Sequence, residues 1–68
     1  MNENEIEVST YDILLRSLEN SRELVRDFEN YSKSIDNEKI QEIFKQFAED
    51  EGHHAAQFRK LLLDYKDN

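Results

Sequence analysis

The chain has no cysteine, no proline, no tryptophan and a single glycine among its 68 residues. Without cysteine it can form no disulfide, no thiolate zinc site and no cysteine nucleophile. The near absence of proline and glycine leaves few residues for the tight turns of a sheet, so the composition predicts an all-α protein. No apolar run approaches the roughly 18 residues of a membrane span, and no signal-peptide pattern opens the chain.

Positive charge is also scarce, with 9 Lys+Arg against 16 Asp+Glu and a formal net charge of -7. A nucleic-acid-binding protein would show clustered Lys and Arg, so we expect no nucleic-acid partner. From the lack of a membrane-span or signal-peptide pattern we expect no membrane partner and a cytoplasmic location. A domain of this length is marginally stable unless a metal, disulfides or oligomerisation support it. Because disulfides are excluded, metal binding or a protein partner is left as the support.

One helical hairpin is predicted at residues 9–66, between two tails. Residues 1–8 are acidic and lack a helical period, so we expect a flexible tail there, with a second tail at residues 67–68. The first helix is predicted at about residues 10–33, and the hydroxyl of Ser9 or Thr10 caps its start. Turn-prone residues predict the turn at about residues 34–36. The second helix is predicted at about residues 37–65, with Asp36 or Ser34 as its N-cap.

Apolar residues recur every three or four positions in both helices and predict one apolar stripe on each. The first stripe contains Tyr11, Leu14, Leu18, Ser21, Val25, Phe28, Ser32 and Ile35. The second contains Ile40, Phe44, Phe47, Glu51, His54, Phe58, Leu61 and Tyr65. A short turn places Phe28 opposite Phe44, and Ser21 opposite Glu51. With their apolar flanks the stripes are too wide for two helices to cover, so we expect an antiparallel hairpin that forms a homodimeric four-helix bundle.

Two polar residues, Glu51 and His54, interrupt the second stripe. A carboxylate at a core position is costly unless it is paired or bound to a metal. The Glu-x-x-His spacing projects both side chains from one helix face, as in bundle-core di-iron and di-manganese sites, and these ligands suit iron, manganese or zinc. In the structural alternative, Glu51 lies at the edge of the stripe with its head in water, and His54 is a hydrogen-bonded core histidine. Asp50 and His53 lie on the flank, where we expect surface side chains that could hydrogen-bond to a site.

The sequence from Ile43 to Leu62 resembles the second helix of the rubrerythrin-like, ferritin-like proteins. There an apolar pair precedes an Ala-Glu-x-Glu-x-x-His-Ala core and an apolar-Lys-Leu-Leu ending. The stretch from Leu18 to Lys39 resembles the first helix and turn of the same half-bundle, so the resemblance covers roughly residues 10–65. It implies a ferritin-like bundle with a carboxylate-bridged di-iron site, in a family whose members are often oxidoreductases or iron-handling proteins. By the same resemblance, Glu51 matches the bridging carboxylate and His54 the imidazole ligand.

The chain departs from the family pattern in two respects. The first-helix carboxylate of the family falls opposite Glu51, where this chain has Ser21. The family hairpin is usually duplicated, whereas here it occurs once, so the full bundle needs a homodimer. Such a dimer offers two carboxylates and two imidazoles, enough for one four-coordinate ion or for a poorly held pair completed by water. The alternative is a degenerate site in which Ser21 donates a hydrogen bond to Glu51 within a structural polar layer.

Three functions remain open at this point. The first is a small metal-binding protein with a redox or iron-handling role. The alternative is a non-catalytic structural or protein-interaction hairpin with a degenerate metal site. In a third, the hairpin pairs with a larger helical protein, whose surface would be basic. No catalytic residue is assigned, because the sequence has no nucleophile–base arrangement, phosphate loop or dinucleotide-binding fingerprint.

Overall fold

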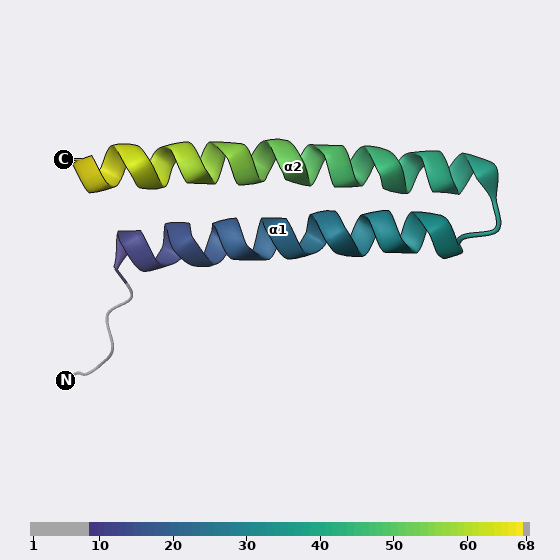
Figure 1. The fold of residues 1–68 in the computed structure, drawn as a ribbon, viewed down its shortest axis with the longest axis horizontal. Helices are drawn as coiled ribbons and strands as arrows, with labels where there is room; N and C mark the ends of the chain where they lie inside the picture. Colours follow the sequence, from purple (N-terminus) through teal and green to yellow (C-terminus); the bar gives the residue numbers. More distant parts are fainter. Residues whose placement is uncertain (1–8, 68) are drawn as a thin grey trace, which may run out of the picture.

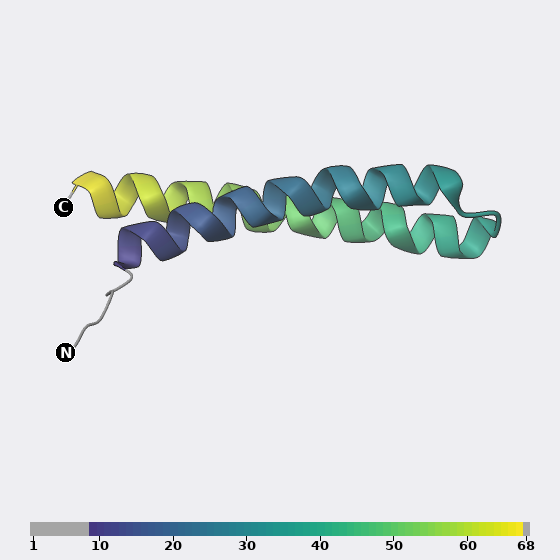
Figure 2. The same ribbon diagram turned by 90° about the horizontal axis from the view of Figure 1, so that it is seen from below.

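Two antiparallel helices make up the hairpin, as predicted for the all-α fold class (Figure 1). A computed structural model describes residues 9–67, so the tail predicted at residues 1–8 and the last residue, Asn68, lie outside the described residues. Helix α1 spans Thr10–Ser34 and helix α2 spans Glu38–Asp67. The two helices lie side by side along their length and cross at a shallow angle (Figure 2). The Cα atoms extend 51 Å along the longest axis and 12 Å along the shortest, so the molecule is long and thin.

Helix α1 begins at the cap that the sequence indicates. The Ser9 side-chain oxygen accepts a hydrogen bond of 3.1 Å from the backbone N–H of Asp12. Asp12 lies in the first turn, where the helix dipole favours negative charge, and Lys33 lies in the last turn, where it favours positive charge. At the other end, the N–H of Ile35 closes the helix on the carbonyl of Tyr31 at 3.0 Å.

The turn is one residue later than predicted, and the N-cap of α2 is a different residue. Residues 35–37 connect the helices, and the Asn37 Oδ1 atom accepts the N–H of Ile40 at 3.0 Å. The prediction of Asp36 or Ser34 as the cap is therefore wrong. Asn and Asp are nearly equivalent as N-cap residues. Residue type alone therefore does not choose between Asp36 and Asn37, and the position of the backbone at the helix start does. At the other end, α2 continues through Asp67, into the predicted second tail, since no glycine or proline stops it.

The side of α2 that faces α1 is rotated from the predicted stripe. On α2 the buried and half-buried residues are Gln41, Phe44, Ala48, Glu51, Ala55, Phe58 and Leu62. Phe44, Glu51 and Phe58 belong to the predicted stripe, but its other members are exposed: Ile40, Phe47, His54, Leu61 and Tyr65. At 100° per residue, the exposed set is centred about 80° from the side that faces α1. Helix α2 therefore carries two stripes, of which the hairpin covers one.

The predicted register between the helices is confirmed by a cluster of aromatic rings. Phe28 meets Phe44 edge-on with ring centroids 5.9 Å apart, and it also meets Phe47 at 5.7 Å. Tyr31 lies against Phe44 at 6.4 Å. These contacts place Phe28 and Tyr31 on the same side of the hairpin as the exposed stripe of α2. We call this side the apolar face, and it contains Phe28, Tyr31, Ile40, Ile43, Phe47, His54, Leu61 and Tyr65.

Charged residues line the opposite side. The groove between the helices there is bounded by Glu29, Lys45, Ala48 and Glu49. Lys45 and Glu49 each lie two residues from Phe47, about 200° around the helix, which places them away from the apolar face. The hairpin is thus strongly two-sided. Neither helix is long and apolar enough to cross a membrane, among the residues that the structure describes.

Candidate metal site

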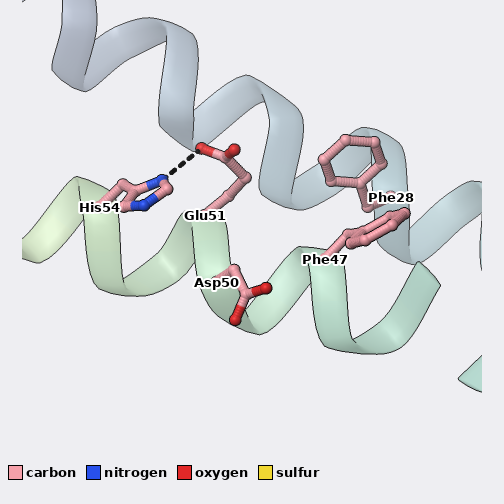
Figure 3. A pocket seen from close by; sticks show the side chains of 5 residues that line it. All are labelled: Phe28, Phe47, Asp50, Glu51 and His54. Atoms are coloured by element: carbon pink, nitrogen blue, oxygen red, sulfur yellow. Dashed lines mark hydrogen bonds and ion pairs between the residues drawn. The ribbon is translucent and has the colours of Figure 1, made fainter. Parts of the chain in front are cut away.

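Glu51 and His54 come together on α2, as their spacing predicts. They lie three residues apart, and the Glu51 Oε1 atom is 3.4 Å from the His54 Nδ1 atom (Figure 3). The Glu51 side chain is 21% exposed and that of His54 is 55% exposed. The carboxylate of Glu51 thus reaches toward α1 while the imidazole lies at the edge of the apolar face. The expected burial of His54 within the hairpin is wrong, because the ring projects beside the contact with α1 and not into it.

A shallow pocket of about 290 Å³ opens at this pair on the apolar face. Phe28 of α1 and Phe47 of α2 form its wall, and Asp50, Glu51 and His54 complete the lining. The Glu51 carboxylate thus shares this pocket with two aromatic rings. A carboxylate beside apolar groups favours a partner that supplies charge or a hydrogen bond. Within the hairpin that partner is the imidazole of His54.

The other candidate side chains do not converge on the pair. Asp50 accepts a hydrogen bond of 3.0 Å from the side-chain amide of Gln46, and its carboxylate points away from Glu51 and His54 (Figure 3). His53 is exposed. Ser21 is buried, with 5% of its surface exposed, yet among the described residues no hydrogen bond joins its hydroxyl to Glu51. The predicted Ser21–Glu51 hydrogen bond is therefore absent from the hairpin.

Among the described residues, Gln46 is a neighbour of the site that the sequence alone did not indicate. It lies four residues before Asp50, which is the spacing at which glutamine and aspartate side chains meet on a helix. That spacing is the signal by which it could have been found. By holding Asp50 through an amide, Gln46 keeps this carboxylate at the outer rim of the pocket.

The separation of the two donor atoms suits a shared metal ion. Bonds of about 2.1 Å in a tetrahedral shell put neighbouring ligand atoms about 3.4 Å apart, which is the distance from Glu51 Oε1 to His54 Nδ1. However, among the side chains that the structure describes, at residues 9–65, no three acidic, histidine or cysteine side chains are close enough to hold an ion. One chain therefore supplies two ligands, which is half of a four-coordinate shell.

Comparison with known proteins agrees with the fold. A family model described as Rubrerythrin matches residues 10–68, which includes both helices and the whole candidate site. Comparisons with curated proteins and with solved structures give no significant match. Because the family model covers far more than half of the sequence, the chain belongs to the rubrerythrin family.

Proposed function

We propose that the protein binds iron, manganese or zinc through Glu51 and His54, and that the same two residues of a second copy complete the ligand shell. The observation that carries this proposal is the 3.4 Å separation of Glu51 Oε1 and His54 Nδ1, which matches the edge of a metal coordination shell. Membership of the rubrerythrin family supports iron. Two carboxylates and two imidazoles are hard and borderline ligands, which these three metals accept.

Two features of the chain's own residues set the polarity and the charge of the proposed site. Phe28 and Phe47 line the pocket in which the carboxylate lies, so apolar groups surround part of the proposed site. Ser21 stands where the family pattern has a first-helix carboxylate, so the site carries less negative charge than a full di-iron site. When bound, iron or manganese would supply one-electron chemistry, and this is the basis for a proposed redox or iron-handling role.

Metal titration of the protein without an affinity tag tests the proposal. We expect Fe(II), under anaerobic conditions, Mn(II) or Zn(II) to bind at one or two ions per dimer in calorimetry. His54→Ala should abolish binding, because it removes half of the ligands. His53→Ala is the matched control, since it removes the adjacent, exposed imidazole, and it should bind like the parent protein.

Failure of every metal to bind at micromolar concentration, with the protein folded, would reject the proposal. Such a result would favour a structural or interaction hairpin with a degenerate site. Equal loss of binding in both histidine variants would also contradict it, since it would place the ion at the helix surface and not at the Glu51–His54 pair.

A further inference from the structure

Basic residues line the groove on the charged side of the hairpin. Glu29 and Lys45 bound this groove. Seven residues make about two helical turns, so Gly52 and Arg59 continue the line of Lys45 along α2. By the same spacing, Arg22 continues the line of Glu29 along α1. Arginines from both helices therefore lie on the same side of a chain whose formal net charge is -7.

Arg22 and Arg59 flank the same part of the groove. The ring contact of Phe28 with Phe44 sets the register of the two helices. Six residues from this contact along each helix, Arg22 lies within about 3 Å of the level of Gly52. Arg59 lies about 10.5 Å beyond Gly52 along α2, and long side chains in a helix lean toward its N-terminus. Because the helices are antiparallel, this lean brings the two guanidinium groups toward each other.

Small residues keep the space between the two arginines open. A Cβ atom added to Gly52 would meet nothing within 4 Å. Packing within the hairpin therefore gives no reason for glycine here, although glycine destabilises the interior of a helix relative to alanine. Ala56, one turn further along α2, is also exposed and has only a methyl side chain. The groove thus has a low floor at this level, with room for a ligand above it.

Among the described residues, no carboxylate pairs with these arginines. The ion pairs that the described residues form with one another are Lys45–Glu42 and His54–Glu51. Arg22 and Arg59 are both exposed. A guanidinium presents its donors in a planar fork that matches the oxygens of a phosphate group. Two such forks beside an open space favour an anion with several oxygens.

We infer that this part of the groove binds a small phosphate-bearing anion, between Arg22 of α1 and Arg59 of α2 and above Gly52. Arg26 lies one turn from Arg22 along α1 and supplies a third positive charge beside the site. Charges from three arginines suit a diphosphate better than a single carboxylate. The groove lies on the opposite side of the hairpin from the apolar face, so the inference does not rest on the proposed function.

Titration of the whole chain with sodium pyrophosphate tests the inference. The protein is first freed of metal on a chelating resin, because pyrophosphate also binds metal ions. The chain has a single glycine, so one amide signal in the glycine region of a proton–nitrogen correlation spectrum reports on Gly52. We expect this signal to move along a saturable curve with pyrophosphate, and not with sodium chloride at the same ionic strength. No saturable shift at millimolar pyrophosphate would overturn the inference.

Charge-removing variants locate the site. Arg22→Gln and Arg59→Gln should each weaken pyrophosphate binding about tenfold in calorimetry, because each removes a charged hydrogen-bond donor. Arg16→Gln is the matched control, since it removes the same charge from an exposed arginine that lies about 120° around α1 from Arg22. It should bind like the parent protein. Equal weakening in all three variants would show a response to overall charge alone, and no site in the groove.

A variant that fills the floor separates binding from stability. Gly52→Leu should weaken pyrophosphate binding and melt at no lower temperature than the parent protein, because leucine favours a helix more than glycine does and its Cβ has room. Unchanged binding would place the anion elsewhere and contradict the inference. Saturable binding of an oligoglutamate peptide, with none of pyrophosphate, would also overturn it, since the groove would then hold an acidic protein segment.

Discussion

Two serines of α1, Ser21 and Ser32, are buried against α2 to almost the same extent, with 5% and 4% of their surfaces exposed. The Ser32 hydroxyl donates a hydrogen bond of 2.7 Å to the carbonyl of Glu29, whereas among the described residues Ser21 makes no side-chain hydrogen bond. A buried hydroxyl without a partner costs about 1–3 kcal/mol. Ser21 is also the position where the family pattern has a carboxylate. It is therefore the residue at which one substitution should change the proposed metal binding.

Ser21→Glu should destabilise the metal-free protein and strengthen metal binding. In EDTA we expect the free energy of unfolding to fall by about 2 kcal/mol or more, because a carboxylate is buried without a partner. Saturating Mn(II) or Zn(II) should recover that loss, since a ligand that binds only the native state stabilises it. Thermal melting with and without metal measures both effects.

Ser32→Glu provides the control for this experiment, being equally buried but distant from Glu51 and His54. It should lose stability to a similar degree and regain none of it with metal. Equal recovery in both variants would show that added carboxylates act through general charge effects, and that Ser21 has no special place beside the site.

At the scale of single elements, the helices and their caps follow closely from local sequence. Ser9 was one of two predicted caps for α1, and the observed hydrogen bond to Asp12 selects it. Local sequence did not distinguish Asp36 from Asn37 at the start of α2, because both side chains can accept the same backbone N–H groups. In the structure the backbone places Asn37 at that position, where its Oδ1 atom accepts the N–H of Ile40.

Asn37→Ala should lower the free energy of unfolding by about 1 kcal/mol, because it removes the side-chain oxygen that caps α2. Asp36→Ala should change it by less than about 0.5 kcal/mol, since Asp36 is outside the helix and caps nothing in the described structure. Urea unfolding of both variants at one protein concentration makes the comparison. A larger loss for Asp36→Ala than for Asn37→Ala would show that the cap is assigned to the wrong residue.

The direction in which α2 faces could be predicted only in part. The strict stripe from Ile40 to Tyr65 includes Phe44 and Phe58, which face α1, and also His54 and Leu61, which are exposed. Such a stripe lies between the two apolar sides of α2, and in a four-helix bundle it would point to the centre. Periodicity identifies a stripe but not how many helices cover it. The spacing of three residues was enough to predict that Glu51 and His54 lie close together on α2. The exposure of His54 could not be predicted in this way, because it depends on which side of α2 the hairpin covers.

At the scale of the whole molecule, a single hairpin has little interior. Leu18 and Ala48 are the buried apolar residues among those described, and the aromatic cluster around Phe28 and Phe44 stays half exposed. Domains below about 70–80 residues seldom gain more than 3–5 kcal/mol from one core. The apolar face holds most of the remaining hydrophobic area, so the stability of the fold should depend on covering it.

This dependence predicts that the metal-free protein melts at a temperature that rises with its own concentration. For a dimer that unfolds to two chains, a hundredfold increase in concentration stabilises the folded state by about 2.7 kcal/mol. For two 68-residue chains this raises the Tm by roughly 9 °C. Leu61→Glu should melt at a lower temperature that does not change with concentration, because a charge on the apolar face prevents the second copy from packing. A parent Tm that stays constant over the same range would mean that the hairpin is stable alone, and the exposed stripe of α2 would then need another explanation.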